Sequence, residues 1–331
     1  MLLNQGQRIS QRTWRDGLMI SSTMKMARID WLLDRRKGIG GSDVSAILGL
    51  NKWKSAYQIW LEKTGQVELS ESDSEPAYWG TVLEEVVAKE FAVRTGKKVR
   101  RRNQVFEHPE YPFLRANIDR DVVGENAILE CKTANQFLSK EWDGEEVPLS
   151  YLCQVQHYMN VLDRDYCYFA VLIGGQKFIW KRIERDQELI DSITKRLIGF
   201  WEENVIKGIE PSIDGSDATK KFLNAHYNEE GLNEITLSNH FDELIESKKQ
   251  LKETEKSIKI QIQEIDNQIK SELGKRNAVI GISPKHVVSW KQQNRTTLDK
   301  KLLTEKYPEI ANDSSIYKIS SYKKLVEKEI G

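Results

Sequence analysis

The chain has 331 residues, of which 39% are hydrophobic and 30% are charged, a composition typical of a globular protein with one or two domains. Its 50 basic and 50 acidic residues cancel, so any affinity for nucleic acid must come from local patches. There is no apolar run of about 18 residues, and we expect neither a membrane-spanning helix nor a membrane partner. The three cysteines form no CxxC pair, which argues against an iron–sulfur cluster and fits a reducing, cytoplasmic setting.

The first part of the chain is predicted to be a polar leader followed by short helices. Residues 1–28 lack an apolar signal core, and we interpret them as a leader with a tendency to disorder. Glycines at 65 and 96 are expected to end two of the helices. The acidic, serine-rich stretch 68–75 is expected to be a solvated loop. The predicted helices cover residues 44–48, 55–63 and 78–94.

Strands and helices alternate in the middle of the chain. Turn-prone residues near Gly124, and the Gly174-Gly175 pair, indicate two hairpins. The order of elements predicts an α/β or α+β core, with a mixed central sheet flanked by helices. The predicted strands cover residues 113–119, 127–132, 166–173 and 177–183, and the predicted helices cover residues 149–162 and 187–206.

The pattern changes after residue 210. Residues 211–236 are polar and are interpreted as a linker between a core domain over 29–210 and a C-terminal extension over 237–331. The extension begins with a long helix of coiled-coil type, which packs either on its own domain or against another subunit or partner. Short strands and a lysine-rich helical tail follow. The heptad row consists of Leu237, Leu244, Leu251, Ile258 and Ile265, and Lys248 and Glu255 interrupt its companion row.

Two acids and a lysine in the first predicted hairpin carry the strongest chemical signal. Glu130 and Lys132 are two residues apart, so in a strand they project from the same face, and the partner strand can bring Asp119 beside them. Carboxylate oxygens hold Mg²⁺, and a lysine helps to position or deprotonate a water. This is the chemistry of a metal-dependent phosphodiesterase. Such triplets also occur by chance, so the pattern needs support from other residues.

Further polar residues could belong to the same site. Glu84, on the predicted helix 78–94, could complete a two-metal cage, although most helical glutamates are simply solvated. Gln154 and Tyr158 share a helix face and line either the site or an exposed polar stripe. Arg35 precedes a glycine-rich turn with Ser42 at a helix start, which suits a phosphate or only an N-cap.

Other patterns are less specific. The basic run that contains Arg100, Arg101 and Arg102 could follow a nucleic-acid backbone or form a solvated strand edge. The Cys131 side chain is expected to point into the core, which leaves its backbone carbonyl available to a metal. The glycine spacing fits neither a Walker A loop nor a dinucleotide fingerprint, and we expect no zinc site.

Taken together and in this order, the motifs resemble the YqaJ-type viral recombinase family, relatives of phage lambda exonuclease among the PD-(D/E)xK nucleases. The resemblance covers about residues 29–207 and implies a nuclease core with a restriction-endonuclease-like fold. Ile118 stands where the family has proline, a tolerated change because proline is not a ligand. The motifs are Trp31-x-x-x-Arg35-x-x-Gly38-Ile39-Gly40-Gly41-Ser42-Asp43, Trp79-Gly80-x-x-x-Glu84, Asp119, Glu130-x-Lys132 and Gln154-x-Gln156-x-Tyr158.

The resemblance implies a Mg²⁺-dependent 5′→3′ exonuclease, with Mn²⁺ as a possible substitute. It degrades one strand of linear double-stranded DNA and leaves a 3′ single strand for a single-strand annealing protein of the RecT or Bet type. Relatives form trimeric rings, and such proteins are encoded by phages or prophages in bacterial cells. Two ions would be held by Asp119, Glu130, the Cys131 carbonyl and Glu84.

The resemblance also assigns roles to single residues. Lys132 would act on the attacking water, and two nearby metal ions would depress its pKa. Gln154 would orient that water or the scissile phosphate. The 5′-terminal phosphate would be held by Arg35 and Ser42, and the expected DNA contacts are Gln156, Tyr158, Arg100, Arg101 and Arg102.

Three alternatives remain. The chain could be a restriction-like endonuclease, a Cas4-like nuclease or an inactive DNA-binding recombination scaffold. The absence of a four-cysteine set argues against the Cas4-like nuclease. The intact set of Asp119, Glu130 and Lys132 argues against the scaffold, since an inactive copy tends to lose one of these residues.

Overall fold

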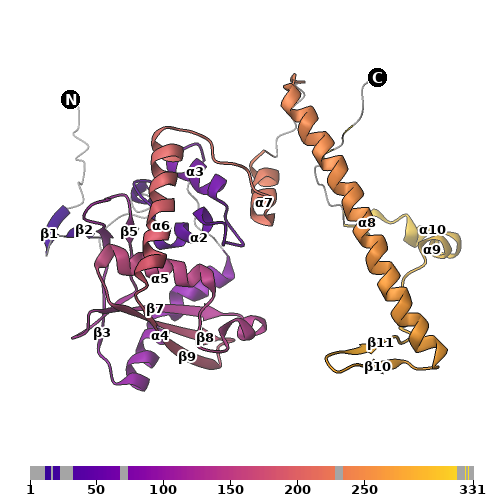
Figure 1. Cartoon of the computed structure of the whole chain (residues 1–331), viewed down its shortest axis with the longest axis horizontal. Helices are drawn as coiled ribbons and strands as arrows, with labels where there is room; N and C mark the ends of the chain where they lie inside the picture. Colours follow the sequence, from indigo (N-terminus) through magenta and orange to yellow (C-terminus); the bar gives the residue numbers. More distant parts are fainter. Residues whose placement is uncertain are drawn as a thin grey trace. The chain divides into compact units, whose positions relative to one another are not determined.

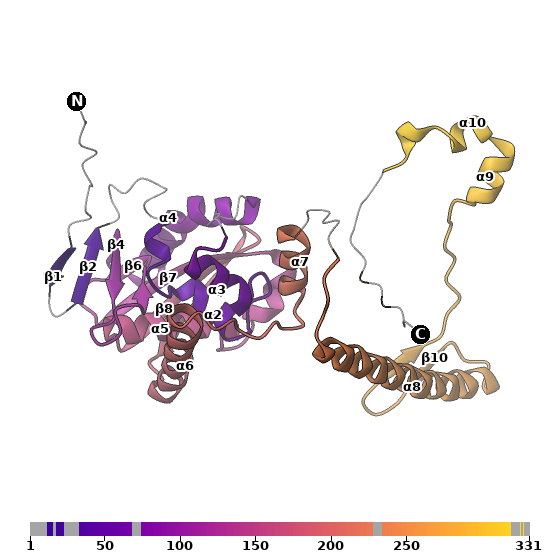
Figure 2. The same cartoon turned by 90° about the horizontal axis from the view of Figure 1, so that it is seen from above.

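The structure, a computed structural model, describes residues 12–15, 18–22, 33–67, 74–227, 234–318, 325 and 327 (Figures 1 and 2). The chain divides into two compact units, Met1–Asn228 and Glu229–Gly331. The boundary lies inside the predicted linker 211–236, which is not wholly irregular because it contains helix α7 (Asp217–His226). Most of the predicted acidic loop 68–75 lies outside the described residues.

The first unit is built on a mixed sheet, as the sequence predicted, and this sheet has five strands. The strand order is β3-β6-β7-β8-β9, and only β7 and β8 run parallel. Helix α5 (Leu149–Leu162) connects this parallel pair, as a crossover between parallel strands requires. The strands are β3 (Val99–Arg101), β6 (Arg120–Val122), β7 (Ala127–Ala134), β8 (Tyr166–Ile173) and β9 (Lys177–Glu184).

Helices cover both faces of this sheet (Figure 1). Leu129 and Cys131 of β7 pack in one hydrophobic cluster with Phe91 of helix α4 (Glu75–Thr95). Ile128 belongs to the larger cluster on the other face, which includes residues of α5 and of helix α2 (Gly41–Ile47). Because side chains alternate along a strand, Glu130 and Lys132 share the α5 side with Ile128.

The predicted helices are formed with small shifts at their ends. Helix α3 (Ala56–Thr64) is capped by the Ser55 side chain and ends at Gly65 in the left-handed region, and α4 ends at Gly96 in the same way. The observed bounds of α5 and β8 equal the predicted ones. Helix α6 (Gln187–Gly199) continues into a π-helical segment, η2 (Phe200–Ile206), which completes the predicted helix 187–206.

A second sheet, of order β1-β2-β4-β5, contains two strands that the sequence analysis missed. Strands β1 and β2 lie inside the predicted polar leader, and β2 pairs with β4. The sequence signal was present, because Asp16-Gly17 between them is a typical hairpin turn sequence. The strands are β1 (Arg12–Arg15), β2 (Leu18–Ser22), β4 (Gln104–Glu107) and β5 (Arg115–Ala116).

The predicted continuous strand 113–119 is wrong. Within it only β5 is a strand, and β5 pairs with β4 in the second sheet. The chain then enters the central sheet at β6, where Arg120 pairs with Leu129. Asp119 therefore lies immediately before β6. The alternation of buried hydrophobic residues continues through the change of sheet, so the hydrophobic periodicity could not reveal this change. These residues are Leu114, Ala116 and Ile118.

The second unit begins with α8 (Asn239–Lys275), which confirms the predicted long helix. Its heptad residues, among them Leu244, Leu251 and Ile258, are exposed. Within the described residues, no helix is both long and apolar enough to cross a membrane. The unit also contains β10 (Ile280–Ile282), β11 (Val287–Ser289), α9 (Lys300–Lys306), α10 (Pro308–Ala311) and a short 3-10 turn, η3 (Ser314–Ile316).

The division into two units predicts that the first folds without the second. All residues of both hydrophobic clusters lie before the boundary at residue 229. Removal of residues 237–331 should therefore leave the cooperative thermal transition of the remaining chain intact, as followed by circular dichroism. An insoluble truncated protein, or one without a cooperative transition, would show that the extension is part of one core.

Gly41 allows α2 to approach α5 closely. A Cβ atom at this position would lie 2.5 Å from Cζ of Tyr158, which is far inside contact distance. Gly41→Ala should therefore lower the free energy of unfolding by about 1–3 kcal/mol, measured by urea denaturation. Gly40→Ala is the matched control, because its nearest atom, Oδ2 of Asp43, would lie 3.9 Å away. Equal stability losses in the two variants would contradict the proposed packing constraint.

Candidate active site

The structure brings Asp119, Glu130 and Lys132 together at β7. Nζ of Lys132 donates to Oε1 of Glu130 in an ion pair. Oδ2 of Asp119 accepts a hydrogen bond of 2.7 Å from the backbone N–H of Cys131. The strand that carries Glu130 and Lys132 therefore also fixes the Asp119 carboxylate beside them.

Burial affects the pKa values of Asp119 and Lys132 in this cluster. Glu130 is only 2% exposed. Burial, together with repulsion from Glu130, raises the pKa of Asp119 to about 8. Burial would lower the pKa of Lys132, but the carboxylates of Glu130 and Asp119 outweigh it and raise this pKa. In the protein alone, the pKa of Lys132 is therefore raised, whereas two nearby metal ions were expected to depress it. A bound cation would relieve the repulsion between the two carboxylates.

Gln154 and Tyr158 extend the cluster from α5. Nε2 of Gln154 donates to Oε1 of Glu130 at 2.9 Å and to the Tyr158 hydroxyl at 3.1 Å. Oε1 of Glu130 therefore accepts from both Gln154 and Lys132. Its other oxygen, Oε2, is buried without a hydrogen-bond partner. An unpaired buried carboxylate oxygen is costly in a protein, and it is a ligand atom that a divalent cation prefers.

The Cys131 thiol is excluded from this site. Its side chain is 7% exposed and packs in the cluster on the α4 face of the sheet. Burial, followed by the nearby carboxylates, raises the pKa of the thiol, which therefore stays neutral. Cys131 can contribute only backbone atoms to the α5 side, as the sequence analysis expected.

Two arginines engage the Glu84 carboxylate in this structure, and its role as a metal ligand stays a prediction. Its Oε1 accepts a 2.6 Å hydrogen bond from Nη1 of Arg120 and lies 3.6 Å from Nη2 of Arg101. In the part of the chain that the structure describes, no group of three or more His, Cys, Asp or Glu residues is arranged to hold a metal ion. The arginine charge satisfies the carboxylate that was predicted to approach the second ion.

Arg120 is a site residue that the sequence analysis missed. Besides Glu84, its guanidinium binds Glu85 at 2.7 Å and the backbone carbonyl of Asp119 at 2.6 Å. It is 2% exposed. Arg120 thus ties α4 to the residue that carries the Asp119 carboxylate. Its position directly after Asp119 was the only available sequence signal.

Arg35 and Ser42 lie together at the start of α2, as predicted. Nη2 of Arg35 donates to Oγ of Ser42 at 3.2 Å and lies 3.6 Å from Oδ1 of Asp43. A buried ion pair of 2.6 Å joins Asp43 to Lys63, which also donates to the Arg35 carbonyl at 2.7 Å. Burial would raise the pKa of Asp43, but the two cations hold it below its usual value. Lys63 was not anticipated from the sequence.

The segment before α2 is anchored by a second buried arginine. Nη1 of Arg115 donates to the Asp34 carbonyl at 2.9 Å and to its Oδ2 at 3.0 Å, and Nη2 binds Glu107. This network fixes the backbone next to Arg35. Gly41, which follows in α2, lies against the Tyr158 ring, and the Tyr158 hydroxyl binds Gln154. The Arg35–Ser42 pair is therefore connected by packing to the Glu130 cluster.

The predicted DNA contact of Gln156 is wrong. This side chain is 1% exposed, and both ends of its amide bind backbone: Nε2 donates to the Glu184 carbonyl at 2.8 Å, and Oε1 accepts from the Asp186 N–H at 3.0 Å. Two residues along a helix rotate a side chain by about 200°. Gln156 therefore faces away from Gln154 and joins α5 to the end of β9.

The three arginines of the basic run differ in their surroundings. Arg102 forms a close ion pair with Asp121, whereas Arg100 lies 3.6 Å from the same residue. Arg101 reaches Glu84. The side chains of Arg100 and Arg101 are 60% and 54% exposed, against 25% for Arg102. Arg102 has a structural ion pair, and the predicted DNA contact is more accessible at Arg100 and Arg101.

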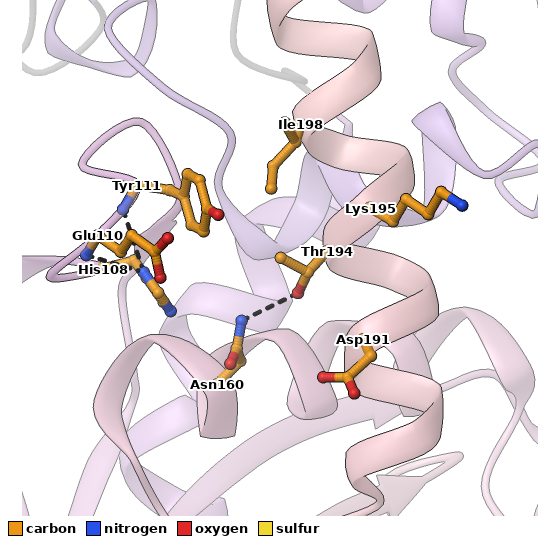
Figure 3. Close-up of a pocket in the computed structure, with 8 residues that line it drawn as sticks. All are labelled: His108, Glu110, Tyr111, Asn160, Asp191, Thr194, Lys195 and Ile198. Carbon is orange, nitrogen blue, oxygen red and sulfur yellow. Dashed lines mark hydrogen bonds between the residues drawn. The ribbon is translucent and has the colours of Figure 1, made fainter.

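A separate pocket of about 400 Å³ lies between α5, α6 and the segment after β4 (Figure 3). Asn160 donates to Thr194 at 3.0 Å across its floor, and Lys195 points away from the other lining side chains. Nδ1 of His108 is occupied by the backbone N–H groups of Glu110 and Tyr111. The pocket contains none of the predicted site residues, so it is distinct from the Glu130 cluster.

Two crystal structures of exonucleases overlap with part of the chain. The alkaline exonuclease LHK-Exo from Laribacter hongkongensis has a TM-score of 0.47 and 20% identity, and the match covers 54% of this chain and 93% of that one. The phage-related exonuclease from Haemophilus somnus 129PT has a TM-score of 0.43 and 17% identity, over 52% of this chain and 96% of that one.

Sequence relatives extend further along the chain. Residues 30–165 match the YqaJ-like viral recombinase domain. An uncharacterized protein of Bacillus subtilis (strain 168), named YqaJ, is 48% identical over 297 residues, which cover 88% of this chain and 92% of that protein. The similarity therefore includes most of the C-terminal extension as well as the core. The chain belongs to the YqaJ-like viral recombinase family.

Proposed function

We propose that this protein is a metal-dependent nuclease that degrades linear double-stranded DNA in the 5′→3′ direction. The observation that carries the proposal is the buried carboxylate of Glu130, with Asp119 and Lys132 beside it and Oε2 unpaired. Phosphodiester hydrolysis needs a site for a hard cation and a group that positions the attacking water, and this cluster offers both. Membership of a viral recombinase family agrees with a DNA substrate.

Asp119 and Glu130, with the Cys131 carbonyl, are the proposed ligands of Mg²⁺, for which Mn²⁺ can substitute. A bound divalent cation would supply Lewis-acid stabilisation of the negative charge that develops on the phosphate. The unpaired Oε2 of Glu130 and the hard oxygen donors fit such an ion. A second ion near Glu84 would require this carboxylate to leave Arg120.

The remaining residues position the reactants. Nζ of Lys132 is held by Glu130 and lies where it can orient the attacking water. Gln154 holds Glu130 with one amide hydrogen and Tyr158 with the other, and it forms the wall of the site on α5. A water and a scissile phosphate bound beside these side chains would be held close together, and such proximity contributes to the rate.

Arg35 and Ser42 form the proposed pocket for the 5′-terminal phosphate. A guanidinium group can bind phosphate through two parallel hydrogen bonds, and Ser42 adds a hydroxyl donor. Arg115 and Lys63 fix the backbone around this pair, so a phosphate held there would lie at a defined distance from the Glu130 cluster. Such a pocket would favour digestion from the 5′ end.

The 3′ single strand that digestion leaves is the proposed substrate of a single-strand annealing protein. We also propose that the protein forms a trimeric ring through which the duplex is threaded. Its proposed location is the bacterial cytoplasm, where it would act on phage or prophage DNA. Contacts with the DNA backbone rather than the bases dominate such an enzyme, so cleavage should show little sequence preference.

A digestion time course tests this proposal. With Mg²⁺, linear duplex labelled at either end should lose nucleotides from its 5′ ends, whereas closed circles should stay intact and EDTA should stop the reaction. Lys132→Ala should reduce the rate by about 10²–10⁴-fold without weakening DNA binding in EDTA, because the lysine acts on the reacting groups. Cutting of circles would favour an endonuclease, and a Lys132→Ala protein that cuts at the wild-type rate would remove the lysine from the mechanism.

The phosphate pocket is tested separately with Arg35→Ala. The wild type should prefer 5′-phosphorylated over 5′-hydroxyl ends, and the variant should lose at least about tenfold of this preference, because a charge-assisted bidentate contact contributes roughly 1.5–3 kcal/mol. Lys37→Ala is the control. It removes an equal charge only two residues from Arg35, and the Lys37 side chain pairs with Asp34. If Arg35→Ala keeps the preference of the wild type, the pocket lies elsewhere.

A further inference from the structure

An excess of positive charge begins at the last residue of α8. Residues 275–298, here named the basic hairpin segment, contain five Lys and Arg residues and no Asp or Glu. The whole chain has 50 residues of each sign, so a stretch of this length without an acid departs from the average. The five residues are Lys275, Arg276, Lys285, Lys291 and Arg295.

The segment contains the β10–β11 hairpin. The strands pair antiparallel with Gly281 opposite Val288, and the Trp290 N–H extends the ladder to the Val279 carbonyl at 2.9 Å. Ser283 closes the turn through its backbone N–H, which donates to the His286 carbonyl at 2.8 Å. Lys285 therefore lies at the tip of the hairpin, and Lys291 follows its second strand.

The hairpin is fixed to the end of α8. Leu273 of α8 is 7% exposed. A Cβ atom at Gly281 would lie 3.0 Å from Cδ2 of Leu273, and Gly274 lies close to the Trp290 ring. One face of the hairpin therefore packs on the helix, and the other face and the tip extend into solvent. The ribbon therefore presents Lys285 at its tip, Lys291 follows its second strand, and Arg295 lies in the irregular segment before α9.

Four of the five cations have no carboxylate partner among the described residues, and three of these four lie in the hairpin or after it. Arg276 is engaged by Glu272 at 2.6 Å on the preceding helical turn. Lys285, Lys291 and Arg295 are exposed, and none of them pairs with a carboxylate among the residues that the structure describes. The amide side chains of Gln292, Gln293 and Asn294 lie between Lys291 and Arg295 in the sequence and can also donate hydrogen bonds.

We propose that the basic hairpin segment binds the phosphate backbone of duplex DNA and does not require a DNA end for this binding. A two-stranded ribbon fits the major groove of B-DNA, and lysine, arginine and amide side chains are the usual donors to phosphate. This inference goes beyond the proposed catalytic function. It rests on that function only in taking DNA as the substrate, and it does not depend on where the DNA is cut.

A protein partner is the competing occupant, because the exposed face of the hairpin contains Ile280, Ile282 and Val287. These side chains form a small apolar patch. An acidic protein would also need hydrogen-bond and shape complementarity to it. The charge favours DNA over a protein, because a segment with several unpaired cations and no acid can bind anywhere along the negatively charged DNA backbone. The experiment below uses DNA alone and so separates the two occupants.

The test measures binding of the full-length protein in EDTA to a short labelled duplex whose two ends are closed by loops. This probe has no 5′-terminal phosphate, so the Arg35–Ser42 pocket does not contribute. The triple variant Lys285→Gln, Lys291→Gln, Arg295→Gln should bind at least about tenfold more weakly at 0.1 M salt. The slope of log K against log salt should fall by about 2–3, because each phosphate contact contributes about 0.9.

The matched control is the triple variant Lys256→Gln, Lys259→Gln, Lys270→Gln, which removes the same charge from α8. It should bind the closed duplex like the wild type. Equal binding by the wild type and the hairpin variant, or equal weakening in both variants, would overturn the inference. End digestion at saturating enzyme is measured in parallel. If the hairpin variant binds the closed duplex weakly but still digests linear DNA, the inference is supported. If the wild type digests linear DNA without binding the closed duplex, the inference is contradicted and the nuclease proposal is unaffected.

Discussion

The burial of the Glu130 carboxylate beside Asp119 is the constraint on which the rest of the first unit depends. A buried carboxylate without compensation is strongly unfavourable. Lys132 and Gln154 satisfy one oxygen of Glu130, and the Cys131 N–H satisfies Asp119. Both arrangements require β7 to hold the acids in register and α5 to pack directly on that face of the sheet. The second oxygen of Glu130, which has no hydrogen-bond partner, is the proposed ligand atom for a cation.

Two surrounding ion-pair networks connect this arrangement to the neighbouring helices. On one side, Arg120 joins α4 to the Asp119 backbone through Glu84 and Glu85. On the other side, Lys63 and Asp43 fix the start of α2, from which Gly41 touches Tyr158. The carboxylates, the proposed phosphate pocket and the sheet are thus parts of one packed structure. A displacement in either network should reach the Glu130 cluster through a small number of contacts.

Local patterns predicted the parts of the site that depend on local geometry. The two-residue spacing of Glu130 and Lys132 placed both on one strand face, and the four-residue spacing of Gln154 and Tyr158 placed both on one helix face. Arg120 and Lys63 were missed because their partners, such as Glu84 and Asp43, are distant in sequence and no periodicity connects them. Gln156 was assigned by its place in a motif, although its helical position turns it toward Glu184 and Asp186.

The central claim is that Glu130 is a metal ligand, and binding of Mn²⁺ followed by electron paramagnetic resonance tests it most directly. Glu130→Gln keeps the shape of the side chain and removes its charge. The control is Glu125→Gln, which removes the charge of a carboxylate that pairs with Lys97. The account predicts that the wild type and Glu125→Gln bind Mn²⁺ and that Glu130→Gln loses most of this binding. Equal Mn²⁺ binding by wild type and Glu130→Gln would contradict the account.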